Sequence, residues 1–212
     1  MTIFEAIEAG DAEALRQALD LRPELAGERN ADGLSPVLYA LYNGSSDLVE
    51  PLLDANPPLD VFDSTAVGRT RGLEELLDGD RELAKAWSRD GFTPLHLAAF
   101  FGQHEAAKIL LQSGAEVNLV ARNESIHVTP LHSAAAGSHA AIVKLLLEHG
   151  ADPNAAQDGG FTPLHTAAQN DDRESVEALL EAGADPSFVD DEGKRPADLA
   201  GDATRDLVAF SN

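Results

Sequence analysis

The histidines are the residues whose chemistry the sequence suggests first, because imidazole binds metals and transfers protons near neutral pH. Of the seven, His96, His132 and His165 each end a Thr-Pro-Leu-His segment, at intervals of 36 and 33 residues. Equivalent positions on packed helices lie about 10 Å apart, whereas zinc ligands must all lie about 2 Å from one ion. We therefore predict three buried imidazoles that hydrogen-bond the backbone and the capping threonine, with no metal site and no cofactor. His127 is the other histidine of interest, because it falls in a predicted loop.

Adjacent carboxylates are the second candidates for chemistry. Asp171-Asp172 and Asp190-Asp191-Glu192 could supply an acid and a base. Both groups fall in predicted turns, where water would leave their pKa values ordinary, so we expect a solvated surface. The sequence has no cysteine, no glycine-rich phosphate loop and no G-x-S-x-G elbow. These observations predict that the protein is not an enzyme.

The charge of the chain excludes several kinds of partner. It has 37 acidic and 15 basic residues, a formal net charge of −22. A protein with so many acidic residues has a negative surface that repels phosphates. The charge therefore argues against binding to nucleic acid or to an anionic membrane surface. The start, Met1-Thr2-Ile3-Phe4-Glu5, does not read as a secretory signal, and no run of about 18 apolar residues could span a membrane. We expect a cytoplasmic monomer.

Three nearly identical segments indicate the elements that carry these residues. Thr93–Ala99, Thr129–Ala135 and Thr162–Ala168 share the pattern Thr-Pro-Leu-His-x-Ala-Ala, and each is followed by a Leu-Leu pair and a Gly-Ala pair. A threonine can cap a helix, and proline suits the first helical turn. The leucines and alanines would form its buried face. Each segment is therefore expected to begin a helix that turns into a second, antiparallel helix.

This pattern resembles the ankyrin repeat, which has a T-P-L-H-x-A signature and a period of about 33 residues. The resemblance implies an all-α solenoid of about six helix-turn-helix repeats, with protruding hairpin or loop fingers and a C-terminal cap, as in small stand-alone bacterial-type ankyrin repeat proteins. Residues 1–212 would form a single domain. Its repeats would span approximately 1–32, 33–58, 59–90, 91–126, 127–159 and 160–192, with the cap at 193–212.

Two local departures from the repeat lead to specific expectations. Only 24 residues separate Gly44 from Gly68, which predicts a missing finger between repeats two and three. Pro51 falls inside a predicted second helix, where a regular helix would be broken, so we expect a kink or a late start. In repeat five, Gly137 precedes the usual glycine position, which Ser138 occupies. That displacement puts the geometry of this turn in question.

The resemblance implies a non-catalytic adaptor that binds another protein through its concave face and finger tips. The candidate contact residues are Tyr42, Asn43, Arg89, Asp90, Phe92, Phe100, Phe101, Ile126, His127, Asp158, Phe161, Gln169 and Asn170. Only 5% of residues are aromatic, yet Phe92, Phe100 and Phe101 lie in one repeat. They either pack under a finger and over a seam between repeats, or at least one contacts a partner.

The finger around residues 121–128 is the second unusual feature. It is three residues longer than its counterparts and carries the apolar Ile126 and Val128. The extra length is either a tolerated insertion or part of a contact with a partner protein.

The negative charge favours a partner with a basic surface. It also leaves a different function open, an acidic DNA mimic or inhibitor that occupies the basic surface of another protein. A third alternative is assembly by stacking of the ends. The polar cap residues Asp202, Arg205, Asp206 and Ser211 argue against stacking, since a polar cap stops propagation of repeats.

Overall fold

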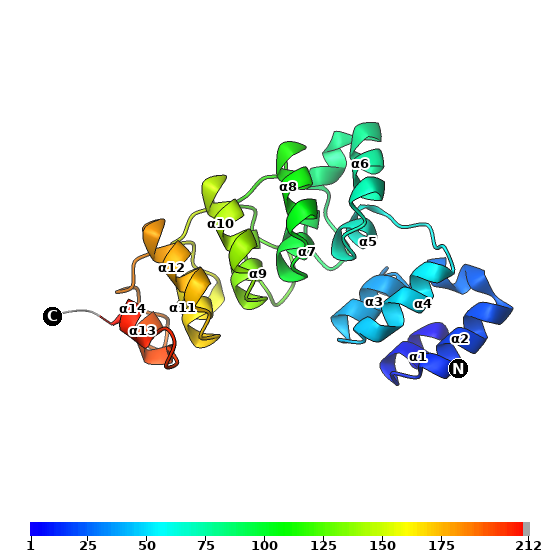
Figure 1. Cartoon of the computed structure of the whole chain (residues 1–212), viewed down its shortest axis with the longest axis horizontal. Helices are drawn as coiled ribbons and strands as arrows, with labels where there is room; N and C mark the ends of the chain where they lie inside the picture. Colours follow the sequence, from blue (N-terminus) through cyan, green and yellow to red (C-terminus); the bar gives the residue numbers. More distant parts are fainter. Residues whose placement is uncertain (210–212) are drawn as a thin grey trace.

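The computed structural model describes residues 1–209 as paired helices joined by loops (Figure 1); Ser211 lies outside these residues. The pairs are α1 (Ile3–Glu8) with α2 (Ala12–Leu21), α3 (Pro36–Tyr42) with α4 (Val49–Asp54), α5 (Val61–Ala66) with α6 (Thr70–Gly79), α7 (Pro94–Phe100) with α8 (His104–Gln112), α9 (Pro130–Ala136) with α10 (Ala140–Glu148), α11 (Pro163–Gln169) with α12 (Arg173–Glu181), and α13 (Pro196–Leu199) with α14 (Arg205–Val208). Short 3-10 turns are η1 (Pro23–Gly27), η2 (Ser46–Leu48), η3 (Arg81–Lys85) and η4 (Asp158–Gly160). No strand occurs within these 209 residues.

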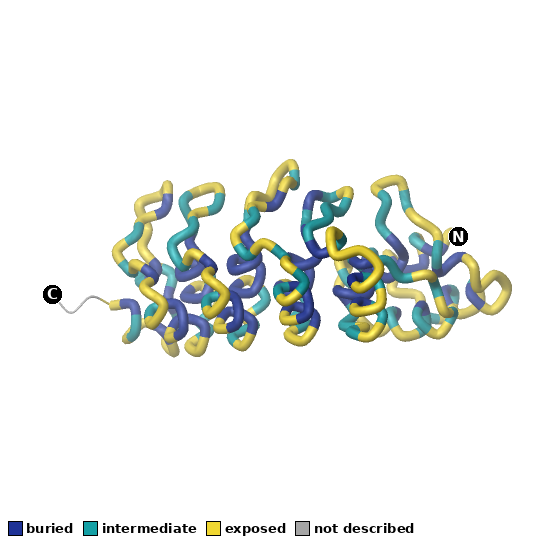
Figure 2. The backbone as a smooth tube through the Cα atoms, turned by 90° about the horizontal axis from the view of Figure 1, so that it is seen from above, coloured by how far each residue is buried: buried dark blue, intermediate teal, exposed yellow. Residues whose placement is uncertain are grey.

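The helix pairs stack in chain order along an arc, with the two ends of the chain at opposite ends (Figure 1). Loops that precede the first helices project to one side of this stack (Figure 2). The predicted all-α solenoid is therefore confirmed. None of the helices described is long and apolar enough to cross a membrane.

Each threonine–histidine pair forms hydrogen bonds both at the start of its own helix and to the backbone that follows in the next repeat. At α9 the backbone N–H of Thr129 donates to Nδ1 of His132 (3.3 Å), whose Nε2 lies 3.2 Å from the Phe161 carbonyl oxygen. Since Nδ1 accepts a hydrogen bond, the ring proton is on Nε2 and donates to that carbonyl. His96 Nε2 similarly reaches the Val128 carbonyl (3.0 Å) and His165 Nε2 reaches Lys194 (3.2 Å). The predicted structural role of these histidines is confirmed.

Backbone hydrogen bonds close loops that we call fingers, at residues 30–34, 88–92, 121–128, 157–161 and 190–194. The finger at 121–128 contains three residues more than its neighbours, as predicted. Residues 55–60 connect α4 directly to α5 and form no finger. The short interval between Gly44 and Gly68 therefore correctly predicts the missing finger.

The junction of repeats two and three, which we call the 2–3 seam, is held differently from the others. One buried apolar cluster extends from Ile3 to Leu52 and another from Val61 to Val208, with a small cluster around Leu38, Ala66 and Leu97 between them. The two large cores are therefore joined through a narrow apolar contact.

Charged groups reinforce the 2–3 seam. Arg29 Nη2 lies 2.8 Å from Asp60 Oδ2 and 3.1 Å from Asp63 Oδ2, and the Ser35 hydroxyl donates to Asp63. Asp63 occupies the position that histidine holds in later repeats. Burial raises the pKa of Asp63, as does the nearby Asp60 carboxylate, and the Ser35 hydrogen bond and Arg29 oppose this change.

Pro51 is accommodated by a late helix start. The 3-10 turn Ser46–Leu48 precedes α4, which begins at Val49, so Pro51 lies in the first helical turn. Proline is tolerated there because its missing N–H would have no intrahelical partner. This confirms the expectation for Pro51.

The turn between α9 and α10 keeps the usual geometry despite its displaced glycine. Ser138 adopts a left-handed φ of +55°, the region that Gly102 occupies at +73° in the preceding repeat. A Cβ at Gly137 would lie 2.8 Å from the Phe100 carbonyl oxygen. Repeat five therefore needs glycine at 137 for close packing and has serine at the strained position.

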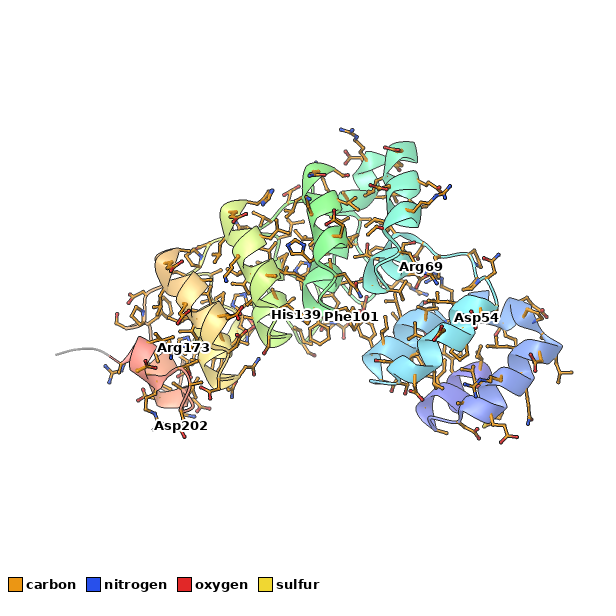
Figure 3. The ribbon with its side chains drawn as sticks, in the orientation of Figure 1. Asp54, Arg69, Phe101, His139, Arg173 and Asp202 are labelled. Carbon is orange, nitrogen blue, oxygen red and sulfur yellow. The ribbon has the colours of Figure 1, made fainter. Side chains whose placement is uncertain are left out.

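These inter-helix turns also link successive repeats along one edge, where Figure 3 labels Arg69, Phe101, His139 and Arg173. Gln103 Nε2 donates to the Ala66 carbonyl (2.9 Å), His139 Nε2 lies 3.0 Å from the Phe100 carbonyl, and Asn170 Nδ2 donates to Ala135 (3.1 Å). Each bond joins a side chain to the backbone of the repeat before it.

The adjacent acidic residues are only partly the solvated surface groups that the sequence predicts: Asp191 and Glu192 are exposed, whereas Asp171, Asp172 and Asp190 make structural hydrogen bonds. Asp171 accepts hydrogen bonds from the Thr204 hydroxyl (2.8 Å) and the Ala203 N–H (3.1 Å), which lower its pKa. Asp172 caps α12. Asp190 is buried and accepts the N–H groups of its own finger. The prediction of ordinary pKa values was therefore wrong for Asp171, because the cap packs against the turn that carries it.

Candidate partner-binding groove

A groove of about 540 Å³ crosses the concave side of the stack at repeats four to six. First helices α7, α9 and α11 form its floor, and the fingers at 88–92, 121–128 and 157–161 form one wall. Its lining residues are Tyr42, Asp90, Phe92, His96, Leu97, Phe100, Ile126, Val128, His132, Ser133, Ala136, Gln157, Phe161, Thr166 and Gln169. We call this surface the concave groove.

Most of the concave groove is apolar. Phe100 and Ile126 are each 47% exposed and belong to the small set of large apolar side chains that water reaches. Phe92 is half-buried and its ring lies 6.0 Å from that of His96, beneath the finger that carries it. Phe92 and Ile126 lie on two successive fingers and Phe100 lies at the end of α7, so stacking creates a continuous apolar surface.

One end of the concave groove is polar. The Tyr42 hydroxyl donates to Asp90 Oδ2 (2.9 Å), whereas Asp90 Oδ1 is buried and accepts no hydrogen bond from the described residues. Burial and the Asp90 carboxylate both raise the pKa of Tyr42, so the phenol remains a hydrogen-bond donor at neutral pH. Within residues 1–209, no lysine, arginine or histidine forms an ion pair with Asp90.

The structure brings some of the predicted contact residues together and separates others. Those that line the concave groove are Tyr42, Asp90, Phe92, Phe100, Ile126, Phe161 and Gln169. Those that lie outside it are Asn43, Arg89, Phe101, His127, Asp158 and Asn170.

Three of the outlying residues are engaged in packing or in links between repeats. The Phe101 ring packs against Tyr42 (5.8 Å between centroids) at the 2–3 seam. His127 Nδ1 pairs with Asp158 Oδ2, which joins the tips of two fingers. These contacts account for their absence from the groove wall.

The remaining outlying residues bond the backbone or pack against another finger. Asn43 Nδ2 donates to the Tyr39 carbonyl in its own helix (2.8 Å), and Asn170 bonds the preceding repeat. The stem of Arg89 packs against Gly33 of the first finger. Repeat position alone therefore does not indicate whether a side chain faces the groove.

Some residues of the groove are not among those predicted from the sequence. Leu97, Ser133 and Thr166 occupy one repeat position, directly after the histidine, and all three line the concave groove. The variation of this position among otherwise identical segments is a signal that could have identified them. His96 and His132 also reach the groove.

The buried histidines of the groove are uncharged at neutral pH. Burial lowers the pKa of His96 and of His132 to about 4, so both rings are uncharged at pH 7. In the part of the chain described, no three His, Asp or Glu side chains are arranged to hold a metal ion. The concave groove therefore offers apolar area, one carboxylate and a few hydroxyl and amide groups.

Comparison with known proteins agrees with this architecture. The family described as Ankyrin repeats (3 copies) matches residues 3–121 and 119–190. The chain is 31% identical over 121 residues to mouse Ankyrin repeat and SAM domain-containing protein 6, covering 57% of this chain and 11% of that protein. It is 31% identical over 118 residues to Dauer abnormal formation protein 25 of Caenorhabditis elegans, covering 56% and 24%.

A shorter match of 36% identity over 59 residues is to Palmitoyltransferase akr1 of Aspergillus oryzae, covering 28% of this chain and 8% of that protein. The chain thus spans at most 24% of the length of these three relatives. Ankyrin repeats generally serve as protein–protein interaction modules. Matched over most of its length and built from stacked helix pairs with projecting fingers, the chain belongs to the ankyrin repeat family.

Proposed function

We propose that this protein is a non-catalytic adaptor that binds a partner protein in the concave groove. The observation that carries the proposal is the exposure of Phe100 and Ile126, each 47%, within one groove. Large apolar side chains grouped on a surface mark interaction sites, and aromatic anchors dominate the energy of interfaces. An interface centred on these side chains would remove them from water.

The chemistry of the partner follows from charge. With a net charge of −22, the protein attracts basic surfaces over long range and speeds their encounter. We therefore propose a partner protein with a basic surface, bound by a cytoplasmic monomer of this chain.

The test compares two substitutions that add the same charge. Phe100→Glu places a carboxylate in the concave groove, whereas Leu21→Glu places one on α2, where Leu21 is 83% exposed. Tagged wild-type and variant proteins are used to capture partners from source cells at low and high salt. Captured partners are then purified and titrated by calorimetry, and circular dichroism verifies the fold of each variant.

The proposal expects a partner that wild type and Leu21→Glu hold at both salt concentrations, with affinity for Phe100→Glu at least about tenfold weaker. Binding that ignores Phe100→Glu and disappears at high salt would instead support the acidic DNA mimic or inhibitor, because exposed charge pairs are screened by salt.

A further inference from the structure

We infer that the concave groove binds a partner segment in which an arginine stands next to a large apolar residue, with the guanidinium paired to Asp90. This inference rests on the proposed function, since it concerns the same groove and specifies what enters it.

The first step is the unused acceptor on Asp90. Its Oδ2 receives the Tyr42 hydroxyl, while Oδ1 is buried without a hydrogen-bond partner in the described chain. A buried acceptor without a partner is costly, more so on a charged group. Because Oδ1 has almost no exposed surface, a bound partner would donate to Oδ2, beside the Tyr42 hydroxyl, and a cationic donor would balance the charge of the carboxylate.

The second step is that the protein's own nearby cations are occupied elsewhere. The Arg122 guanidinium lies over the Trp87 ring, 4.1 Å from its centroid, and the Arg89 stem packs against Gly33. Neither forms an ion pair with Asp90, so no cation of the described residues balances this carboxylate, and a cation from outside the chain can do so.

The third step distinguishes arginine from other side chains. Phe92, Phe100 and Tyr42 line the groove together with Asp90. A planar guanidinium can stack on an aromatic face while it donates in its own plane, which an ammonium group does less well. An apolar neighbour of the arginine would cover the exposed faces of Phe100 and Ile126. An acidic segment would be repelled by the net charge of −22.

A displayed library of random peptides tests the inference directly. It is panned against wild type, Asp90→Asn, Asp78→Asn and Phe100→Glu. Asp90→Asn keeps the size of the side chain and an oxygen that can accept from Tyr42. Asp78→Asn makes the same change in charge at an exposed position on α6, away from the groove. Enriched peptides are synthesised and their affinities measured, each also with citrulline in place of arginine.

We expect wild type to enrich peptides with arginine beside leucine, methionine or an aromatic residue. Such a peptide should bind Asp78→Asn within about twofold of wild type, and Asp90→Asn at least about tenfold more weakly. Citrulline should weaken binding to wild type by a similar factor and have little further effect on Asp90→Asn, as for two groups that act together.

Two other outcomes would overturn the inference, and they differ in what they mean for the proposed function. Enriched apolar peptides without arginine that bind Asp90→Asn normally but fail on Phe100→Glu would leave the groove as the binding site and remove the role of Asp90. No enrichment by wild type, or peptides that bind Phe100→Glu as tightly as wild type, would count against both.

Discussion

Acid should destabilise the repeat stack by charging two buried imidazoles, His96 and His132. Each is at most 2% exposed and has Nδ1 facing the backbone N–H of the capping threonine. A proton added to Nδ1 would point a second donor at that N–H and end the hydrogen bond. The ring would also carry a charge in the core. Both effects oppose protonation, and burial lowers each pKa to about 4.

The size of the effect follows from linkage. Because the pKa of each ring is lower in the folded chain than in the unfolded one, the unfolded chain binds more protons as pH falls below 6.5. Stability is therefore lost between pH 6.5 and pH 4. An unfolded pKa of about 6.5 and a folded pKa of about 4 give a loss of about 2 kcal/mol per histidine between pH 7 and pH 4.5.

Urea unfolding at pH 7 and pH 4.5, followed by circular dichroism, measures this loss. His132→Gln removes one titrating ring, and its amide can still accept the Thr129 N–H in a capping box. The variant should be less stable at pH 7, where it lacks the bond to the Phe161 carbonyl, and its loss of stability on acidification should be about 2 kcal/mol smaller. His104→Gln changes an exposed histidine on α8 and should leave the loss as in wild type. An equal loss in wild type and His132→Gln would refute this explanation.

Three further predictions concern stability. Leu131→Ala should cost about 3 kcal/mol in urea unfolding, since Leu131 is fully buried and its removal leaves a cavity between repeats. Ser138→Gly should raise stability by about 0.5–1 kcal/mol by relieving a left-handed φ. Gly137→Ala should lower stability by about 1–3 kcal/mol because its Cβ would clash with the Phe100 carbonyl oxygen. Thermal melting measures both changes. Arg29→Gln should cost about 1–2 kcal/mol by leaving the buried Asp63 carboxylate without its cation, and hydrogen exchange should then quicken first in α1–α4.

Each of these predictions has a contrary result. Leu21→Ala, at an exposed position, should change stability by less than about 0.5 kcal/mol. If Leu131→Ala cost no more than Leu21→Ala, the packing of Leu131 in the core would not contribute to stability as predicted. A Ser138→Gly variant that melts lower than wild type would show that the serine side chain contributes more than its backbone strain costs. Uniform exchange across all helices in Arg29→Gln would show that the 2–3 seam does not separate two units.

The solenoid itself could be predicted from the sequence because its determinants are local. Threonine, proline and histidine at the start of each first helix set a capped helical turn, and the spacing of the repeats sets the stacking. The missing finger follows from counting residues, and the expectation of a kink or a late start follows from the position of Pro51. Their physical causes lie within about one repeat of chain.

The concave groove could be predicted only in part, because it depends on contacts between distant residues. Phe100 and Phe101 are adjacent in sequence, yet one faces the groove and the other fills the 2–3 seam against Tyr42. Tyr42 lies 48 residues from Asp90, its partner. Neither arrangement has a counterpart in the repeat pattern, since both arise where the shortened repeat two meets its neighbours.

The links between repeats bear on how such a chain can grow or shrink. In repeats four to six, His96, His132 and His165 bond carbonyl oxygens of the following repeat, and carbonyl groups are present whatever its side chains are. If a repeat were duplicated or deleted at one of these junctions, the histidine would still find a backbone carbonyl oxygen to which it can donate. Arg29, Asp60 and Asp63 instead recognise one another's side chains. We therefore expect the segment from Arg29 to Asp63 to tolerate an inserted or deleted repeat less readily than the junctions at His96, His132 and His165.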